Sequence, residues 1–324
     1  MELSEFVGIE IRLLSPYHRP LSFEILAESY GQFYGKDESA ASIRHALDSS
    51  VADGLVTDGE DGIRLTREGM TWSHNALMTY AFGESGEMER NSETYQEYRR
   101  RRREAGYFGI TDSPQRDFIS SSLATLEPPV LDLGCGDGTL TTLLQARTGH
   151  QFVGVDVSSA AIEQAQNATG PASQLSFLLR DFNDTGSLDI DFGSAILVDS
   201  LYFAADPVGL LSWTADRISS GGGIVALYSL YAGPGKEPAL LSPRDTPFSA
   251  VAETHSLDFE VTDFGDSEIN HWRVCMTLLA ELRDSFLSER AGFLYYSSHN
   301  EAVIVANMVE SRRSARYGFV LRRQ

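Results

Sequence analysis

Cysteine is scarce in this 324-residue chain, which holds only Cys135 and Cys275. The two lie 140 residues apart, far from the short spacing that zinc ligands share. With so few thiols, no disulfide framework is expected. We therefore expect reduced cysteines and no metal site.

Long apolar runs are also missing. No stretch reaches the roughly 18–20 residues that a membrane helix needs, and residues 1–5 carry two acids where a signal peptide would carry bases. The composition, 42% hydrophobic and 22% charged, is that of an ordinary folded protein. We expect a cytoplasmic protein with no membrane segment, and the length favours about two domains.

Positive charge is the third shortage. The chain has 26 Lys and Arg against 46 Asp and Glu, which gives a formal net charge of −20. A field of that sign repels a polyanion at long range. Nucleic acid is therefore a disfavoured partner.

Residues 1–90 show helix periodicity followed by a hairpin pattern. Apolar residues recur at helix spacing up to Val51, and Gly54 stands where a helix would stop. Residues 55–65 have the pattern of strand, turn and strand, and Thr66 can cap the next helix. This region resembles a winged helix-turn-helix module, which implies a small, mostly α domain.

Winged helices often bind DNA, which requires basic residues on the second helix and in the wing. Here residues 1–90 hold seven Lys or Arg and sixteen Asp or Glu, and the wing itself contains Asp58, Glu60 and Asp61. DNA binding by this region is disfavoured.

Residues 91–112 form a linker that contains five consecutive arginines, 99–103, in an expected helix. Successive residues point in all directions around a helix, so the five cannot form one phosphate-binding stripe. We expect ion pairs with the acidic surface of the protein itself. The alternative is that Tyr98, Arg99 or Tyr107 folds over a bound ligand as part of a lid.

From residue 129 onward strands and helices alternate, which predicts a parallel sheet with helices on both faces. The first strand runs into a turn that contains Gly134, Gly136 and Gly138, and a helix follows. Glycines let the backbone approach a ligand, and a helix N-terminus offers N–H groups to an anion. The expected strands are residues 130–133, 152–155, 177–179, 195–198, 224–228, 259–264 and 317–321.

Side chains around the turn narrow the class of ligand. Thr139 stands where the dinucleotide fingerprint has its third glycine, which weighs against NAD. Asp132 places a negative charge beside the turn. This charge can attract the ammonium group of a ligand, either directly or through a water molecule. Asp156 can accept hydrogen bonds from both ribose hydroxyls, Asp181 can accept from an adenine amino group, and Phe182 can pack on the ring.

Taken in order, these motifs resemble the class I S-adenosylmethionine-dependent methyltransferases, over residues 129 to about 265 plus the final strand. The resemblance implies an α/β fold with a Rossmann-like, seven-stranded sheet and S-adenosylmethionine as cofactor. Asp199 ends the fourth strand at the carboxyl edge, where open α/β sheets bind ligands. The cofactor-binding residues that the resemblance implies are Asp132, Gly134, Cys135, Gly136, Asp156, Val157, Asp181, Phe182 and Asp199.

Two residues of the glycine turn also have plain structural interpretations. Cys135 can fill a small space between the glycines, because nothing nearby would stabilise a reactive thiolate. Asp137 can cap the following helix as readily as it can contact a ligand.

About fifty residues separate the sixth strand from the last, and they predict two helices at about 266–315, the second of which runs from about residue 298 to residue 311. In the family such an insertion commonly covers the substrate pocket; an added packing layer is the alternative. His271 is the candidate general base, with a helix cap or surface position as the plain alternative. His255 is the second candidate base, and Tyr202 and Tyr231 are candidate donors or aromatic walls near the cofactor methyl group.

The resulting hypothesis is methyl transfer to O, N or S of a small molecule. Residues 1–90 would then mediate a homodimer or close the substrate site, before the linker at 91–112 and a methyltransferase domain at 113–324. One alternative is a DNA-binding regulator that senses S-adenosylmethionine. Another alternative is a protein or RNA methyltransferase. The fourth strand lacks an Asn-Pro-Pro-Tyr or Asp-Pro-Pro-Tyr run, and its absence argues against this alternative.

Overall fold

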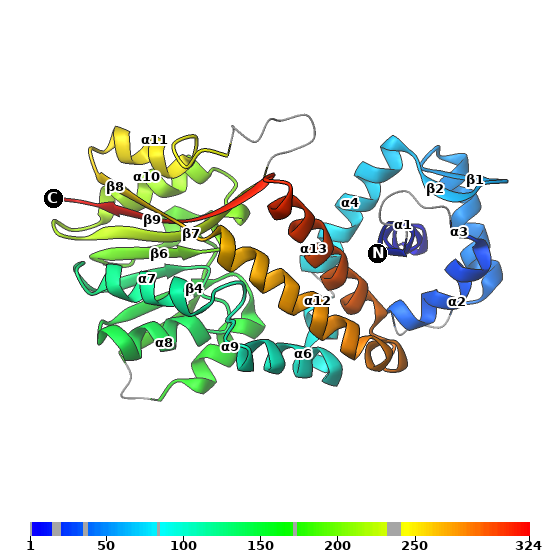
Figure 1. Cartoon of the computed structure of the whole chain (residues 1–324), viewed down its shortest axis with the longest axis horizontal. Coiled ribbons are helices and arrows are strands. Elements are labelled where there is room, and N and C mark those ends of the chain that lie inside the picture. The colour runs from blue at the N-terminus through cyan, green and yellow to red at the C-terminus, as the bar shows by residue number, and fades with distance from the viewer. Residues whose placement is uncertain (1, 15–20, 35–37, 83–84, 171–173, 232–240) are drawn as a thin grey trace. The chain divides into compact units, whose positions relative to one another are not determined.

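The computed structural model describes residues 2–14, 21–34, 38–82, 85–170, 174–231 and 241–324 (Figure 1). The chain forms two compact units, and each is assembled from two segments. The first unit holds Met1–Ala105 and Trp272–Val305, and the second holds Gly106–His271 and Ala306–Gln324. The helical insertion expected at about 266–315 is therefore divided between the two units.

Short helices and one β-hairpin make up the first segment of the first unit. The Ser39 hydroxyl caps α3 by accepting a hydrogen bond from the Ser42 N–H at 3.0 Å, and the chain leaves the helix at Gly54 with φ +71°. Thr66 caps α4 as expected, since its hydroxyl accepts from the Gly69 N–H at 3.0 Å. The elements are α1 (Leu3–Leu14), α2 (Phe23–Tyr34), α3 (Ala40–Ala52), β1 (Val56–Gly59), β2 (Gly62–Leu65), α4 (Arg67–Phe82), α5 (Ser85–Asn91) and α6 (Glu93–Glu104).

This succession of helices followed by an antiparallel hairpin agrees with the pattern found in the sequence. Its identity as a winged helix stays a prediction.

The arginine run lies on α6 and contacts groups of the protein itself. Arg100 forms an ion pair with Glu97 at 2.6 Å and a second with Glu104. Arg101 forms an ion pair with Glu281 of α12 (Gly265–Ser288). Tyr98 is only 3% exposed, so it is buried inside the first unit and not placed on its surface as a lid residue would be.

The second unit is built on a seven-stranded sheet in the order β5-β4-β3-β6-β7-β9-β8. Every neighbouring pair from β5 to β7 is parallel, whereas β9 runs antiparallel to both β7 and β8. The expected α/β, Rossmann-like sheet is confirmed. Its strands are β3 (Val130–Leu133), β4 (Phe152–Asp156), β5 (Leu175–Leu179), β6 (Ser194–Val198), β7 (Gly223–Tyr231), β8 (Asp258–Asp263) and β9 (Ser314–Arg322).

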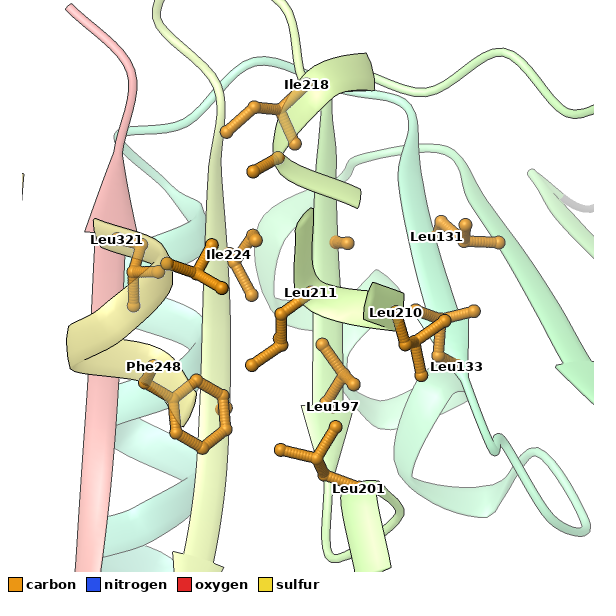
Figure 2. Packing of buried hydrophobic residues seen from close by; sticks show 14 of the residues in the cluster. Leu131, Leu133, Leu197, Leu201, Leu210, Leu211, Ile218, Ile224, Phe248 and Leu321 are labelled. Atoms are coloured by element: carbon orange, nitrogen blue, oxygen red, sulfur yellow. The ribbon is translucent and has the colours of Figure 1, made fainter. Parts of the chain in front are cut away.

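Helices cover both faces of this sheet because both sets of alternating side chains are apolar. Leu131 and Leu133 of β3 belong to the cluster under α10 and α11, whereas Val130, one residue before Leu131, belongs to the cluster under α7 and α8. Figure 2 shows the first cluster, with Leu210 and Leu211 of α10 over the strands. The helices of this unit are α7 (Ser113–Leu123), α8 (Thr139–Thr148), α9 (Ser159–Ala168), α10 (Pro207–Arg217) and α11 (Pro247–Thr254).

Two long helices fill the chain between β8 and β9, as the sequence predicted. The second of them, α13 (Gly292–Glu310), begins earlier than the expected start at about residue 298. Aromatic residues have only moderate helix propensity, so the sequence signal was weak there. Phe293 and Tyr295 are 2% and 5% exposed, and their burial stabilises this first turn.

The strand order fixes where a ligand can enter. The chain moves outward from β3 to β4 and β5, then returns to place β6 on the other side of β3. Loops at the carboxyl ends of β3 and β6 therefore diverge, and open α/β sheets bind ligands at such a switch point. Among the described residues, no helix is both long enough and apolar enough to cross a membrane.

Candidate cofactor and acceptor site

A glycine turn occupies the carboxyl end of β3. Gly134, Gly136 and Gly138 all have positive φ, at +87°, +54° and +70°. A Cβ on Gly134 would lie 2.5 Å from the Cβ of Ser200, and one on Gly138 would lie 2.6 Å from the Phe177 ring. Apart from its two chain neighbours, a Cβ on Gly136 would meet no atom of the described residues within 4 Å. Gly134 and Gly138 are thus fixed by packing, while Gly136 opens toward space in which a ligand can lie.

Asp156, at the end of β4, holds the middle of this turn. Its Oδ2 accepts a hydrogen bond from the Gly136 N–H at 2.9 Å, and its Oδ1 accepts from the Ser158 N–H at 2.8 Å. An ionised carboxylate has about four lone-pair positions, so it can accept ribose hydroxyls as well. The structure therefore places Asp156 at the end of β4, beside the turn, and its contact with a ribose stays a prediction.

Asp132 lies below the turn and is buried. Its Oδ2 accepts a hydrogen bond from the Thr141 hydroxyl at 2.6 Å. Burial raises the pKa of Asp132 to about 7, against the opposing effect of the Thr141 hydrogen bond. A ligand ammonium group close to Asp132 would lower that pKa again.

Cys135 packs as the structural interpretation expected. A Cβ on Gly154 would lie 2.9 Å from both the Cβ and the Sγ of Cys135, so the thiol fills the space that Gly154 leaves. Burial raises the pKa of the thiol, and Asp132 and Asp156 raise it further. The Cys135 N–H donates to the Val155 carbonyl at 3.0 Å, so the turn itself uses this group. Asp137 Oδ1 accepts from the Thr139 N–H at 3.1 Å at the start of α8.

Beyond Asp156 the edge of the sheet offers apolar surface and a further carboxylate. Val157 is 71% exposed, which is unusual for a side chain of this type. Asp181, after β5, accepts hydrogen bonds from the Asn183 N–H at 2.9 Å and from its side-chain amide at 3.1 Å. The Phe182 ring lies 3.7 Å from the position a Cβ on Gly134 would take. An aromatic ring and an exposed aliphatic side chain therefore flank the turn.

The far side of the switch point carries a buried ion pair. Asp199, directly after β6, has φ +55°, and its two oxygens accept from Nη1 and Nη2 of Arg316 at 2.7 and 2.8 Å. Arg316 is fully buried, and its Nε donates to the Gln115 side chain at 2.7 Å. Burial alone would lower the pKa of Arg316, but the Asp199 carboxylate outweighs this and raises it.

Glu268 extends this cluster through two serines. Its Oε1 accepts from the Ser229 hydroxyl at 2.7 Å, and its Oε2 accepts from the Ser314 hydroxyl at 2.9 Å. Ser229 also accepts a hydrogen bond from Arg316 at 3.1 Å, so one chain of contacts runs from Asp199 to Glu268. Burial raises the pKa of Glu268, while Ser229 and Arg316 act in the opposite direction.

Comparisons with known proteins bear on this arrangement. Residues 130–222 match the family model of a methyltransferase domain. An O-methyltransferase of Penicillium expansum is 30% identical over 99 residues, which are 30% of this chain and 36% of that protein. The chain thus matches about a third of the length of this curated relative.

Solved structures share the fold. A cyclopropane synthase from Mycobacterium tuberculosis has a TM-score of 0.53 at 13% identity, over 66% of this chain and 86% of that one. A phosphoethanolamine N-methyltransferase from Haemonchus contortus, solved with S-adenosylhomocysteine, has a TM-score of 0.56 at 12% identity, over 73% and 60%. This chain carries a class I S-adenosylmethionine-dependent methyltransferase domain.

Three features of the methyltransferase domain fit this cofactor. Gly136 faces open space, Asp156 retains acceptor positions, and the buried hydroxyl of Ser200 beside Gly134 has no hydrogen-bond partner among the described residues. Asp132 contributes a buried carboxylate that a cation would stabilise. The residues present are therefore suited to an adenosine group joined to a charged amino acid.

Of the two catalytic candidates, His271 lies at the carboxyl edge of the methyltransferase sheet. It is one turn after Glu268 on α12, which begins directly after β8. His271 is fully buried, and its ring packs edge-on against Tyr107 with the centroids 5.0 Å apart. The plain alternative of a surface position is wrong for this residue.

Tyr202 is held by the neighbouring strand. Its hydroxyl donates to the Ser229 carbonyl at 3.1 Å and also contacts the Ser229 N–H. Burial and the Asp199 charge raise the pKa of Tyr202. Its ring stacks on Tyr228 with centroids 4.4 Å apart, and Tyr231 lies 6.5 Å from it. Tyr202 is therefore better suited to form an aromatic wall than to carry a proton.

The second candidate base, His255, lies at the wrong end of the sheet. It follows α11 and precedes β8. The first residue of β8, Asp258, pairs with Arg322 of β9, and Arg322 also pairs with the first residue of β7. That register places His255 at the amino edge, where its Nδ1 lies 3.3 Å from Asp216. A role in proton transfer at the carboxyl edge is excluded by this topology.

Four polar residues of the site did not appear in the sequence interpretation: Arg316, Gln115, Glu268 and Ser200. The expected last strand began at residue 317, so Arg316 fell just outside it. One usable signal was a charged residue at the start of an otherwise apolar strand, because a buried arginine needs an acidic partner.

Proposed function

We propose that this protein transfers the methyl group of S-adenosylmethionine to an O, N or S atom of a small molecule. The observation that carries the proposal is the open glycine turn at the switch point, with Asp156 hydrogen-bonded to its centre at 2.9 Å. S-adenosylmethionine supplies an already activated methyl group. The protein must then mainly orient the acceptor and exclude water, which can contribute several kcal/mol.

The roles of the residues follow from their places on the edge. Asp156 would accept the ribose hydroxyls, and Val157 would cover the adenine with its exposed side chain. Asp181 would accept from the adenine amino group, and Phe182 would pack beside the turn. Asp132 would compensate the ammonium group, either directly or through water.

On the acceptor side His271 would take the proton from the attacking group. It is buried next to Tyr107, so a proton it accepts would be shielded from solvent. Base catalysis of this kind contributes about 10²- to 10⁴-fold when the nucleophile must lose a proton. Tyr202, Tyr228 and Tyr231 would form an aromatic wall for the acceptor.

Residues 1–90 would serve association or substrate enclosure. Their acidic balance of sixteen to seven argues against contact with DNA. A homodimer formed through this region is the corresponding proposal for assembly.

The test uses the full chain and methyl-labelled S-adenosylmethionine. Calorimetry should show binding, and incubation with fractionated metabolite pools should move the label into a small-molecule fraction. Label recovered in protein or RNA would replace the small-molecule proposal. Cofactor binding with no transfer, together with a salt-sensitive shift of duplex DNA, would favour the regulator instead.

A further inference from the structure

Asn183 joins two loops of the carboxyl edge that belong to distant strands of the sheet. Asn183 follows β5 and the segment it contacts follows β6, whereas β4 and β3 lie between these two strands. The Asn183 side-chain amide donates a hydrogen bond to the Phe203 carbonyl at 3.2 Å, and its Oδ1 accepts from the Ala205 N–H at 2.8 Å. The side chain therefore ties the loop after β5 to the loop after β6.

The same side chain is bonded to Asp181, the carboxylate proposed to contact the adenine. Asp181 Oδ1 accepts from the Asn183 N–H at 2.9 Å and from its side-chain amide at 3.1 Å. Among the described residues, none donates a hydrogen bond to the second oxygen, Oδ2, and Asp181 is exposed. A side-chain amide has two N–H donors, so Asn183 uses one on each loop. Asp181 thus has one oxygen held by Asn183 and one oxygen left for a ligand.

The loop that Asn183 holds carries exposed aromatic side chains. Tyr202 and Phe203 are 39% and 53% exposed, and they lie on a short 3₁₀ helix, η3 (Leu201–Phe203). Asn183 contacts the last carbonyl of η3 and the N–H group two residues beyond it. Neighbouring aromatic rings left exposed at the ligand edge of a sheet are typical of a binding surface. The position of the proposed aromatic wall therefore depends on Asn183 at this end of η3.

We propose that Asn183 is a positioning residue that couples the bound cofactor to the acceptor wall. When Oδ2 of Asp181 accepts from the adenine amino group, Asp181 is fixed, and Asn183 then holds residues 201–205 in place for the acceptor. Hydrogen bonds in a chain strengthen one another, and the coupling of two binding sites is reciprocal. The inference rests on the proposed function and adds that a bound cofactor prepares the acceptor site.

The test is hydrogen exchange of the full chain, read at residues 201–205 with and without saturating S-adenosylhomocysteine. In the wild-type protein the ligand should slow exchange in this segment by at least about fivefold, the low end of typical coupling between sites. Asn183→Ala should still bind the ligand, because Asp181 and Asp156 are kept, but its segment should exchange equally fast with and without it. A merely structural role would speed exchange in the ligand-free variant and leave the response to the ligand intact.

A second ligand and a second variant sharpen the result. The analogue of S-adenosylhomocysteine whose purine carries hydrogen in place of the amino group cannot donate from that position to Asp181. At saturation it should leave exchange in the wild-type segment unchanged. Asn183→Asp keeps an acceptor for the Ala205 N–H but loses both amide donors, so it should also lose the response to S-adenosylhomocysteine.

Asp206 provides a matched control at the end of the same loop. Its Oδ1 accepts from the Gly209 N–H at 2.9 Å and caps α10, so it anchors the loop to a helix and not to Asp181. Asp206→Ala should lower the melting temperature through the lost cap and leave the slowing by S-adenosylhomocysteine intact.

The outcomes separate this inference from the proposed function. If the wild-type protein binds S-adenosylhomocysteine without slower exchange at residues 201–205, or if Asn183→Ala keeps the slowing, the inference is overturned and the proposed function stands. An equal response to the analogue without the amino group would also overturn it, because the coupling would then bypass Asp181. If the wild-type protein does not bind S-adenosylhomocysteine, the proposed function fails first, and this inference fails with it.

Discussion

The two halves of the sheet's carboxyl edge treat their carboxylates in opposite ways. Within the described part of the chain, Asp132 and Asp156, on β3 and β4, accept hydrogen bonds only from a hydroxyl and from backbone N–H groups, so no cationic side chain compensates their charge. Asp199, after β6, is neutralised by a bidentate pair with buried Arg316. The carboxylates on β3 and β4 can therefore attract a cationic group of a ligand. The Asp199 carboxylate after β6 is already paired with an arginine of the last strand.

The difference has a physical cost on each side. Burial without a cationic partner raises the pKa of a carboxyl group, and ionisation of such a group destabilises the fold. A buried ion pair is stable only while both partners are present, because removal of one leaves the other charge uncompensated. The following predictions test the comparison, from the largest expected effect to the smallest.

Arg316→Met should remove the largest amount of stability, about 4 kcal/mol of the free energy of unfolding, because Asp199, whose side chain is only 19% exposed, is left without its partner. Chemical denaturation at pH 7 measures this. Arg322→Met, on the same strand but in a pair with Glu260 that is partly exposed, should cost under about 1 kcal/mol. Similar losses of unfolding free energy in the two variants would mean that the pair of Arg316 with Asp199 contributes no more stability than the exposed pair.

Asp132 should make the ligand-free protein less stable as pH rises. Its pKa is raised from 3.8 to about 7, so its favourable contribution is complete below pH 4 and is lost as pH increases through 7. Asp132→Asn should abolish this dependence and recover about 4 kcal/mol at pH 8.

The measurement is the free energy of unfolding between pH 5 and 8. Wild-type protein should also release a proton when it binds S-adenosylmethionine near pH 7, which calorimetry in buffers of different ionisation enthalpy detects. A pH profile unchanged by the substitution would show that Asp132 ionises normally.

His271→Ala should lower kcat by about 10²-fold or more, with the cofactor affinity nearly unchanged. Turnover with the identified acceptor measures this, and His271→Asn separates the roles. An Asn variant as inactive as Ala supports a base, whereas partial activity would mean that His271 only orients the acceptor. His255→Ala at the amino edge is the control and should retain wild-type turnover.

Asp156→Ala should weaken S-adenosylmethionine binding by about 1.5 to 3 kcal/mol through the loss of both ribose hydrogen bonds. The control is Asp263→Ala, because Asp263 also ends a strand and caps the N–H group two residues onward, at 2.8 Å. A dissociation constant that is equal in both variants would remove Asp156 from the cofactor site.

The half of the edge that we propose binds the cofactor could be predicted from the sequence because its signals are local. Strand, glycine turn and helix follow one another within about twenty residues, and the chain meets Asp132 and Gly134 at predictable points of that pattern. Apolar strands also led to the correct sheet, since both alternating sets of side chains are buried.

The other half could not be predicted because its contacts are distant in sequence. Arg316 meets Asp199 only because β9 inserts beside β7, which no local pattern encodes. The misplacement of His255 has the same origin, since its position relative to the edge depends on the direction of β8. Ser200 went unnoticed because a single serine after a strand is ordinary until its burial is known.

The position of β9 also governs the order in which the protein can be completed during synthesis. β7 and β8 leave the ribosome first, yet the strand that joins them, Ser314–Arg322, follows some fifty residues later. Until then β7 presents an unpaired edge and β8 has no neighbour in the sheet, a state that invites pairing with other chains. Since Arg316 arrives on the same strand, the nascent protein can bury Asp199 with its partner only once β9 has been made.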